Sequence, residues 1–301
     1  MQKITKVIIP AAGFGTRFLP QTKAMPKEML PIVDKPVIQY VVEEAVEAGI
    51  EDVIIVTGWN KRSIEDHFDY PFELISKLKE GGDKKRKMLE EVERSADLAN
   101  FVYLRQKGPN GAMGNAIPIW NARNVIGDEP FMVMWGDDFV ISHPKSRARQ
   151  LIEAYEKYGT SILSTMRRSS PEDANQFGYC GGEEVGDGEY TVTSVIEKPG
   201  IENMPSDRAI FSGYIFTPDF FDAVSHILEN QITGPGGEYI YTDALNVMLE
   251  RGSKIHAIEI KDSEYFDTGT KLAYMKTITQ FALRHPEIGQ NYKEYLHTLE
   301  L

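Results

Sequence analysis

The order of short apolar runs and amphipathic segments is the feature that most limits the fold of this chain. Lys6–Pro10 (KVIIP) and Asp52–Thr57 (DVIIVT) are short, apolar and β-branched, as expected of buried strands. Between them, apolar residues at positions 38, 41, 42, 45 and 46 follow helical spacing, with Pro36 before them and Gly49 after them. This order predicts an α/β fold with a largely parallel sheet. Further strands are predicted at Phe101–Leu104, Phe131–Trp135, Ser161–Met166, Thr191–Ile196, Ile210–Phe216 and Ile255–Ile260.

A glycine-rich turn, Ala11–Pro31 (AAGFGTRFLPQTKAMPKEMLP), follows the first predicted strand directly. Gly13 and Gly15 allow the backbone to turn tightly and to present its N–H groups to a ligand. The same turn carries cationic side chains, among them Arg17 and Lys27. The chain as a whole is acidic, with 33 Lys and Arg against 45 Asp and Glu and a formal charge of −12. Local positive charge on this background indicates a polyphosphate site.

Two familiar phosphate-binding motifs do not fit this turn. A Rossmann fingerprint needs a third glycine where the chain has Phe18, followed by a helix that Pro20 and Pro26 would interrupt. A P-loop needs Gly-Lys-Ser or Gly-Lys-Thr after its glycines, and none follows here. A nucleic-acid partner is not expected either, because the acidic chain shows no dense basic run.

The apolar runs and the cysteine content of the chain predict its cellular location. No run approaches the ~20 apolar residues that cross a bilayer, and the first residues lack the apolar region of a cleavable signal. We therefore expect a cytoplasmic protein without a membrane partner. Its single cysteine, Cys180, cannot form an intrachain disulfide, which suits a reducing compartment. The six histidines show no metal-binding spacing, and the three tryptophans are expected to serve packing.

One domain, residues 1–301, is the simplest organisation, because no linker rich in Pro or Ser divides the chain. The catalytic α/β core is expected to span about residues 1–265, and C-terminal helices residues 266–301. These helices are a possible oligomer contact, and a homodimer or homotetramer is expected. The charged segment Glu73–Arg94 predicts a solvated helical hairpin or lid, and Gly181–Glu189 predicts a flexible β-turn region.

Several motifs together resemble one enzyme family. The run from Gly13 to Gly58 is similar to the signature of bacterial UTP–glucose-1-phosphate uridylyltransferases, also called UDP-glucose pyrophosphorylases. Its glycine and basic positions alone would indicate only sugar-phosphate nucleotidylyltransferases, but the charged insertion after HFDYPFEL narrows the resemblance to the uridylyl branch. The resemblance implies a Rossmann-like nucleotide-diphospho-sugar transferase fold, with a mixed, mostly parallel central sheet flanked by helices. Further similar motifs are GDD at 136–138, FGY at 177–179, IEKP at 196–199, GEYIYTDAL at 237–245 and FDTGTKLAYM at 266–275.

The family reaction implied here is attack by a phosphate oxygen of glucose 1-phosphate on the α-phosphorus of UTP, with Mg²⁺ as cofactor and pyrophosphate as leaving group. Such transfer needs positioned cations and metal-binding carboxylates rather than a protein nucleophile. Asp137 follows an apolar strand and suits a magnesium ligand, with Asp138 as its competitor. Asp267 would supply the second carboxylate, although a helix cap is the simpler role for it. Arg17 and Lys27 would contact the triphosphate.

The resemblance also assigns binding roles along the chain. Base and nucleotide contacts fall on the glycine turn and on the loop after Phe101–Leu104, where the amide of a Gln offers the donor and acceptor that uracil requires. Sugar contacts fall at two glycines and at the end of Thr191–Ile196, where the charged residues could instead form an exposed ion pair. The implied nucleotide-binding residues are Ala12, Gly13, Gly15, Glu28, Gln106 and Gly111; the sugar-binding residues are Gly178, Glu197, Lys198 and Gly213; the catalytic residues are Arg17, Lys27, Asp137 and Lys198.

One departure from the family pattern concerns the base. Gly114 comes eight residues after Gln106, whereas family members usually place this glycine seven after, and Met113 is the added residue. The choice of UTP over dTTP therefore stays open. Two alternatives are a glucose-1-phosphate thymidylyltransferase and a non-catalytic regulator that binds sugar nucleotides. Glu73–Arg94 argues against the first, and the candidate metal carboxylates argue against the second.

Overall fold

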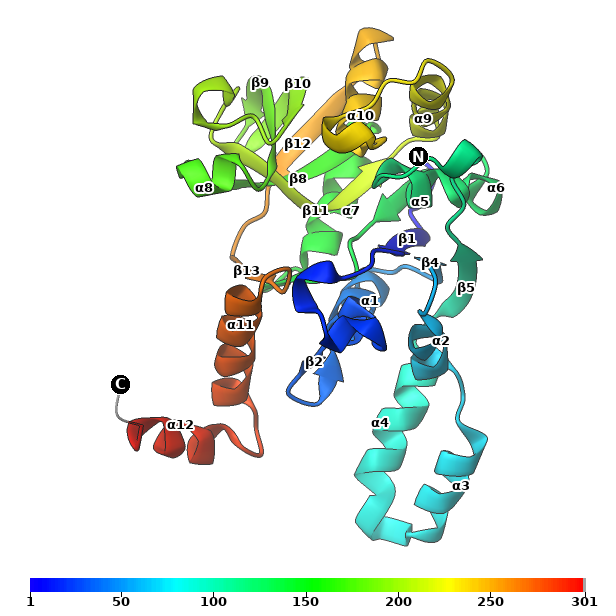
Figure 1. The fold of residues 1–301 in the computed structure, drawn as a ribbon, viewed down its shortest axis with the longest axis vertical. Helices are drawn as coiled ribbons and strands as arrows, with labels where there is room; N and C mark the ends of the chain where they lie inside the picture. Colours follow the sequence, from blue (N-terminus) through cyan, green and yellow to red (C-terminus); the bar gives the residue numbers. More distant parts are fainter. Residues whose placement is uncertain (300–301) are drawn as a thin grey trace.

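A nine-stranded mixed sheet forms the centre of the molecule (Figure 1). The structure is a computed structural model that describes residues 1–299, so positions 300–301 of the predicted C-terminal region lie outside the described residues. The strands of the sheet are β1 (Lys6–Ala11), β4 (Asp52–Thr57), β5 (Asn100–Arg105), β6 (Phe131–Val133), β8 (Ser161–Arg167), β9 (Gly178–Gly186), β10 (Glu189–Glu197), β11 (Arg208–Phe216) and β12 (Ile255–Glu259). Their spatial order is β5-β4-β1-β6-β11-β8-β12-β10-β9.

Most strands of this sheet run in one direction. The pairs β5–β4, β4–β1, β1–β6 and β8–β12 are parallel, while β11 and β10 pair antiparallel with their neighbours. Strands β10 and β11 are reversed, and the other seven of the nine strands share one direction. This arrangement confirms the predicted mixed, mostly parallel sheet. All eight strands predicted from the sequence are present, with ends shifted by up to two residues.

The ninth strand corrects one prediction. The region Gly181–Glu189, expected to be a flexible turn, mostly continues β9 and pairs with β10 from Gly186↔Glu189 to Gly178↔Glu197. A Cβ at Gly182 would lie 2.2 Å from the carbonyl oxygen of Thr191, so the glycine there permits close pairing of the two strands. Gly181, Gly182 and Gly186, which suggested flexibility, thus lie in a paired strand.

Helices cover both faces of the sheet, and the apolar alternation along β1 shows why. Val7 and Ile9 pack in a cluster with α1 (Val37–Glu47) and α7 (Arg147–Tyr158), whereas Ile8 packs in a cluster with α9 (Asp219–Glu229) and its neighbours on the other face. The remaining helices are α2 (Arg62–Phe68), α3 (Phe72–Glu80), α4 (Arg86–Ala96), α5 (Ala116–Asn121), α6 (Arg123–Ile126), α8 (Pro171–Ala174), α10 (Tyr241–Glu250), α11 (Lys271–Arg284) and α12 (Gly289–His297). Two small antiparallel pairs join β2 (Pro31–Ile32) to β3 (Lys35–Pro36), and β7 (Asp138–Ser142) to β13 (Ser263–Asp267).

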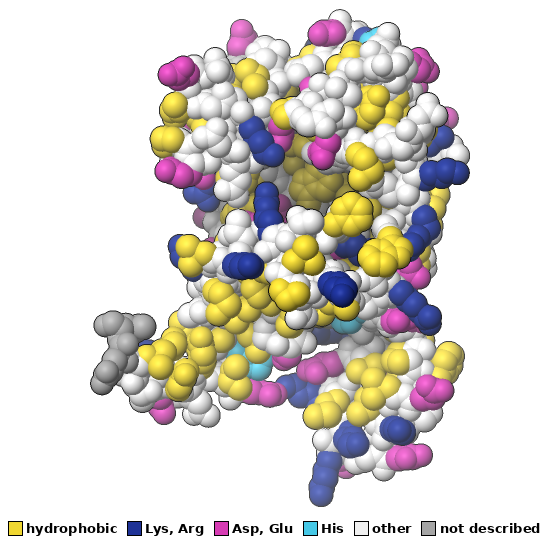
Figure 2. All heavy atoms as spheres, viewed as in Figure 1, with side chains coloured by type: hydrophobic (Ala, Val, Ile, Leu, Met, Phe, Trp, Pro, Cys, Tyr) yellow, Lys and Arg dark blue, Asp and Glu magenta, His cyan; other side chains and the backbone are white. Residues whose placement is uncertain are grey.

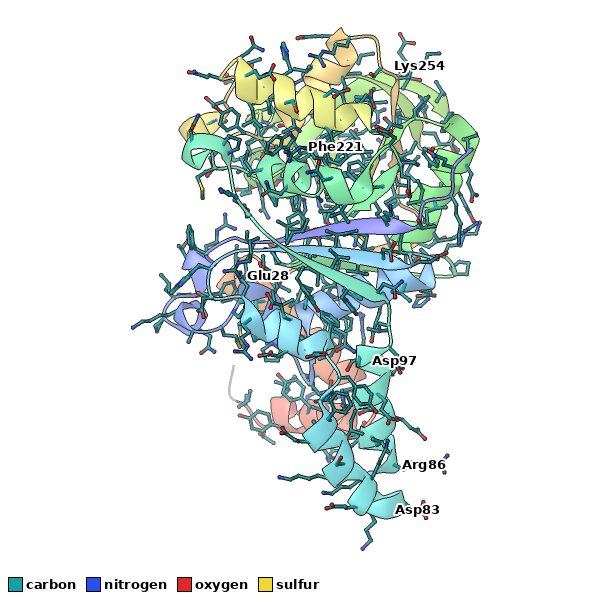
Figure 3. The ribbon with its side chains drawn as sticks, turned by 90° about the vertical axis from the view of Figure 1, so that its right-hand side faces the viewer. Glu28, Asp83, Arg86, Asp97, Phe221 and Lys254 are labelled. Atoms are coloured by element: carbon teal, nitrogen blue, oxygen red, sulfur yellow. The ribbon has the colours of Figure 1, made fainter. Side chains whose placement is uncertain are left out.

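Two helical appendages project from the sheet, as Figure 1 shows. Helices α3 and α4 form the predicted charged hairpin, and Figure 3 places Asp83 and Arg86 at its far end. Helices α11 and α12 lie in the C-terminal region predicted to be helical, although residues 266–267 of that region belong to β13. On both appendages hydrophobic side chains reach the surface seen in Figure 2, and Phe72, Leu272 and Met275 are 74%, 67% and 56% exposed. Within residues 1–299, none of the helices is both long and apolar enough to span a bilayer.

Candidate active site

Two adjoining cavities open where parallel strands end, the usual place for ligands in open α/β sheets. The glycine-turn cavity, about 350 Å³, is lined by residues that follow β1, β5 and β6, and the Lys198 cavity, about 590 Å³, is lined by residues that follow β6 and β10. Figure 2 shows a hollow on this face, with a hydrophobic floor and Lys or Arg side chains at its edge. The two cavities share Lys27, Asn115, Trp135 and Asp137.

The glycine turn folds as short 3₁₀ turns instead of a helix. Gly15 has a φ of 65°, and a Cβ there would lie 3.2 Å from the Cβ atoms of Thr22 and Lys27. The Thr22 hydroxyl donates to the Gly15 carbonyl at 2.7 Å and closes the turn. Ala12, Gly13 and Gly15 all line the glycine-turn cavity, as does Lys27, whose Cε would lie 3.5 Å from a Cβ at Gly13. The turn therefore places the lysine across its own backbone.

The carboxylates predicted to hold a metal line the Lys198 cavity together with the three predicted cations, Arg17, Lys27 and Lys198. Asp137 Oδ2 is 2.5 Å from Lys27 Nζ. Asp267, at the end of β13, accepts a hydrogen bond from the backbone N–H of Gly269 at 2.7 Å. Arg17 donates to the carbonyl of the same glycine at 3.4 Å. Among residues 1–299 there is no cluster of three or more His, Cys, Asp or Glu suited to a metal, so this pair of carboxylates is the donor set to consider.

Asp138 has different surroundings from Asp137. Its Oδ1 lies 3.9 Å from Arg147 Nη1, and the Tyr265 hydroxyl donates to its Oδ2 at 3.5 Å. Burial raises the pKa of Asp138 to about 7, although Arg147 opposes the rise. Arg147 in turn is fully buried and bound by both carboxylate oxygens of Glu44, at 3.1 and 2.7 Å. Asp138 therefore belongs to an interior charge network, and Asp137 is the better candidate for a metal ligand.

The base-recognition candidates line the glycine-turn cavity. Gln106 follows β5, and its backbone N–H donates to the Thr57 carbonyl at 2.8 Å, which fixes the start of the loop. Glu28 is fully buried, and its Oε2 lies 2.7 Å from the Nζ of the buried Lys61. Burial raises the pKa of Glu28, while the charges of Lys61 and Lys27 oppose the rise. Lys61 could not be identified from the sequence, because it lies 33 residues from its partner in the chain.

The sugar-binding candidates Gly178, Glu197 and Lys198 meet in the Lys198 cavity. Gly178 pairs with Glu197 across β9 and β10, and a Cβ at Gly178 would lie 3.0 Å from Glu197 Oε2. Burial raises the pKa of Glu197, opposed by Lys198, whose Nζ lies 3.8 Å from Glu197 Oε1. Lys198 has a φ of 45°, an uncommon conformation for a side-chain-bearing residue, and its N–H donates to the Phe177 carbonyl at 3.1 Å.

Two predicted glycines are not among the residues that line these cavities. Gly111 lines a separate surface groove with the loop of Gly236 and Gly237. Gly213 has a φ of 108°, and a Cβ there would lie 2.9 Å from Arg147 Cδ. The absence of a side chain at Gly213 permits the close approach of α7 to β11, and its contact with a hexose stays a prediction.

Some lining residues escaped the sequence analysis. Trp135 was expected to serve packing, but it lines both cavities and donates from Nε1 to the Tyr214 hydroxyl at 3.3 Å. Asn115 also lines both cavities, and its Oδ1 accepts from the Tyr241 N–H at 2.8 Å. The position of Trp135 directly before the GDD motif was the available signal; Asn115 had a weaker one, its place after the glycine loop.

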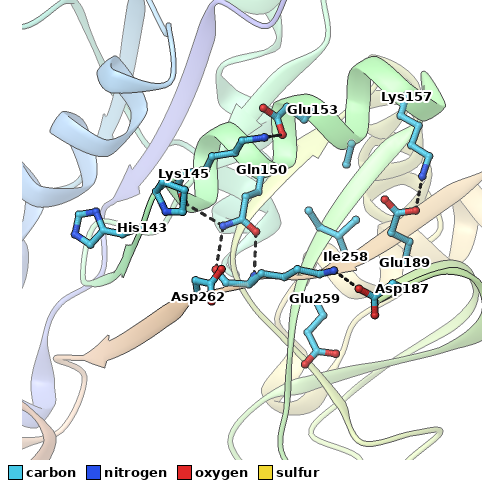
Figure 4. A pocket seen from close by; sticks show the side chains of 14 residues that line it. His143, Lys145, Gln150, Glu153, Lys157, Asp187, Glu189, Ile258, Glu259 and Asp262 are labelled. Carbon is cyan, nitrogen blue, oxygen red and sulfur yellow. Dashed lines mark hydrogen bonds and ion pairs between the residues drawn. The ribbon is translucent and has the colours of Figure 1, made fainter.

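A further hollow, about 490 Å³, lies apart from these cavities between α7, β12 and the turn joining β9 to β10 (Figure 4). Its three lysines are each paired with a carboxylate: Lys145 with Glu153 at 2.7 Å, Lys157 with Glu189 at 2.5 Å, and Lys261 with Asp187. None of the sequence-predicted site residues lines it. Its lysines are already paired and are outnumbered by the carboxylates that line it, so it is a poorer candidate for phosphate binding.

Comparisons with known proteins agree with one another. The family model described as "Nucleotidyl transferase" matches residues 6–283. The chain is 46% identical over 299 residues to the UTP–glucose-1-phosphate uridylyltransferase of Bacillus subtilis (strain 168), covering 99% of this chain and 98% of the relative. A solved UDP-glucose pyrophosphorylase complexed with UDP-glucose is 38% identical, with a TM-score of 0.82, over 94% of this chain and 100% of that one. A UTP-bound UGPase from Acinetobacter baumannii is 30% identical, with a TM-score of 0.86, over 99% and 100%.

Proposed function

Because the chain belongs to the nucleotidyl transferase family, and within it to the UTP–glucose-1-phosphate uridylyltransferases, we propose that it transfers the uridylyl group of UTP to glucose 1-phosphate. The products are UDP-glucose and pyrophosphate. The observation that carries this proposal is that the two adjoining cavities share Lys27 and Asp137. A nucleotide in one cavity and a sugar phosphate in the other would bring their phosphates together at these two side chains.

The bond changes need no protein nucleophile. A phosphate oxygen of glucose 1-phosphate forms a bond to the α-phosphorus of UTP, and the bond from that phosphorus to the bridging oxygen of pyrophosphate breaks. Catalysis of such a transfer rests on alignment and on cations near the phosphate oxygens. Lys27 and Arg17 are assigned to the triphosphate, and Lys198 to the sugar phosphate. Glu197, beside Gly178, is assigned to accept hydrogen bonds from hexose hydroxyls.

Mg²⁺ is the proposed cofactor, and the donor set suits it. Asp137 and Asp267 line the same cavity, and Mg²⁺ is commonly bound by one or two carboxylates together with substrate phosphates and water. The hydrogen bond from Gly269 N–H orients the Asp267 carboxylate. When bound there, the ion would neutralise negative charge that develops on the phosphate oxygens.

Assembly and location are part of the same proposal. We assign the homodimer or homotetramer contact to the C-terminal helices, because Leu272, Met275 and Tyr295 expose 67%, 56% and 57% of their surface there. A cytoplasmic location is part of the proposal because the single cysteine, Cys180, cannot form an intrachain disulfide, which suits a reducing compartment.

A nucleotide panel tests the activity. The protein is incubated with glucose 1-phosphate, Mg²⁺ and each of UTP, dTTP, CTP, ATP and GTP, and both pyrophosphate and the sugar nucleotide are measured. UTP should be the best substrate and dTTP a weak second, because the thymine methyl leaves the pairing edge unchanged. Equal use of dTTP would favour the thymidylyltransferase, in line with the longer loop at Met113. Binding of UDP-glucose without any pyrophosphate release would favour the regulator.

A further inference from the structure

A buried ion pair adjoins the glycine-turn cavity. Glu28 lines this cavity, while Lys61, its partner at 2.7 Å, does not. Both are buried, at 0% and 4% exposure. Lys61 binds only Oε2 of Glu28, and within residues 1–299 the covered Oε1 has no hydrogen-bond partner. One carboxylate oxygen is therefore held by Lys61, and the other is a buried acceptor without a partner in the described part of the chain, on a residue that lines the cavity.

The backbone on both sides fixes this pair. Glu28 sits in the 3₁₀ turn Lys27–Met29, where the Met29 N–H donates to the Pro26 carbonyl at 3.0 Å. Lys61 directly precedes α2, and its carbonyl accepts from the Ile64 N–H at 3.1 Å. These contacts fix the backbone at both residues, and the ion pair with Lys61 holds Oε2 of the carboxylate.

We propose that Lys61 is a positioning residue for base selection, because it holds Glu28, in place of the Gln106 amide, as the fixed acceptor for the N3–H of uracil. The inference rests on the proposed function, in which the nucleotide is UTP. N3–H is the one donor on the pairing edge of uracil, so it is the group on that edge that an ionised carboxylate can bind. Cytosine has an acceptor at N3, which would face the lone pairs of Glu28 Oε1.

The chemistry of lysine makes this assignment testable. A lysine ammonium has three donors and no acceptor, so the atom that faces Lys61 must be an acceptor. In Glu28→Gln, the amide oxygen must therefore face Lys61, and the amide NH₂ must face the cavity. The pocket would then offer a donor where it had offered an acceptor, which matches N3 of cytosine and mismatches N3–H of uracil.

The decisive experiment compares kcat/KM for UTP and for CTP in four proteins: wild type, Glu28→Gln, Lys61→Met and the double variant. Glu28→Gln should lower the UTP-to-CTP ratio by roughly 10²-fold or more, because a buried hydrogen bond is replaced by two facing donors. In the Lys61→Met background, the same Glu28→Gln change should alter the ratio by less than about 10-fold, since the amide is free to rotate. Lys61→Arg should keep the wild-type ratio, because Arg also has donors alone.

The pH dependence supplies a second readout. Burial raises the pKa of Glu28 and Asp137 adds to the rise, whereas Lys61 and Lys27 lower it. Without the Lys61 charge, Glu28 should be protonated at higher pH and could then donate to cytosine. In Lys61→Met the UTP-to-CTP ratio should fall between about pH 9 and about pH 6, by more than in the wild type. A purely structural lysine would give parallel profiles.

Control variants distinguish base selection by Glu28 from a ribose contact and from a general effect of losing an ion pair. Lys35→Met removes a similar 2.7 Å ion pair, to Glu43, outside both cavities, and should leave the ratio unchanged.

If Glu28→Gln changes discrimination against dUTP but not against CTP, Glu28 binds the ribose and the inference is wrong. An equal effect of Glu28→Gln in both Lys61 backgrounds would also overturn it. If Lys61→Met does not fold, Lys61→Gln serves as the second background, because its amide offers an acceptor as well as donors, and an undiminished Glu28→Gln effect there would overturn the inference. A wild type that makes no UDP-glucose would instead refute the proposed function.

Discussion

Lys27 Nζ lies 2.5 Å from Asp137 Oδ2, although the two residues are 110 positions apart in the chain. Burial by itself lowers the pKa of Lys27, but the charges of Asp137, Glu28 and Asp138 outweigh it and raise that pKa, so Lys27 stays a cation. The pair lies in the wall that the two cavities share. It puts one positive and one negative group where the phosphates of both proposed substrates would meet.

Metal removal should abolish activity. In EDTA, pyrophosphate release from UTP and glucose 1-phosphate is expected to cease, and excess Mg²⁺ should restore it, because the ion would neutralise charge on the reacting phosphates. Release is followed by a coupled pyrophosphate assay, with circular dichroism in EDTA as the control for folding. Undiminished turnover in the chelator would contradict a metal-dependent mechanism.

Asp137→Asn should lower kcat by about 10²-fold or more, since it removes a positioned charge from the site of reaction. Steady-state kinetics with both substrates measure the effect. Asp138→Asn is the matched variant, and its smaller effect on kcat should follow from its place in the interior network with Arg147. If Asp138→Asn alone abolishes turnover, the metal belongs to Asp138.

Lys198→Ala should raise KM for glucose 1-phosphate and leave KM for UTP nearly unchanged. The reason is that Lys198 lines only the larger of the two cavities, beside Glu197 and Gly178. Initial rates over a grid of both substrate concentrations separate the two constants. A defect confined to UTP would move Lys198 to the nucleotide.

Arg147→Met should lower the free energy of unfolding by about 3–5 kcal/mol, because it leaves the buried carboxylate of Glu44 unpaired. Urea denaturation measures the change. The double variant Arg147→Met with Glu44→Leu should lose less, since the Glu44 carboxylate is then no longer buried without its partner. Arg86→Met, which breaks an exposed pair with Glu90, should cost less than about 1 kcal/mol.

His67 should make the protein less stable in mild acid. Burial lowers the pKa of His67 below its usual 6.5, only partly offset by Glu43, and its Nε2 lies 2.9 Å from Gln39 Oε1. As pH falls below 6.5, the unfolded chain takes up this proton before the folded protein does, so stability declines, by at most about 1.4 kcal/mol per pH unit. His67→Asn should reduce the difference between unfolding free energies at about pH 7.5 and about pH 5.5. His297→Asn, on an exposed surface, is the control.

Local patterns in the sequence determined most helices and strands and, within the site, the glycine turn. Period-two and helical spacing depend on neighbouring residues, so eight of the nine strands of the sheet, the charged hairpin and the C-terminal helices could be predicted, whereas β9 could not. The glycine turn could be predicted for the same reason, because Gly15 and the prolines restrict their own backbone. The motif resemblance supplied the chemistry of Lys27 and Asp137, but not the 2.5 Å between them.

Only the tertiary structure decided the contacts between distant segments. Lys61 contacts Glu28, 33 residues away in the chain, and Arg147 contacts Glu44, 103 residues away. Neither separation produces a periodic pattern in the sequence. Gly213 illustrates the limit: its missing side chain makes room for Arg147, a neighbour that no local pattern could reveal. Packing selects such partners because buried charges must be paired and buried space must be filled, and both conditions are set by the whole fold.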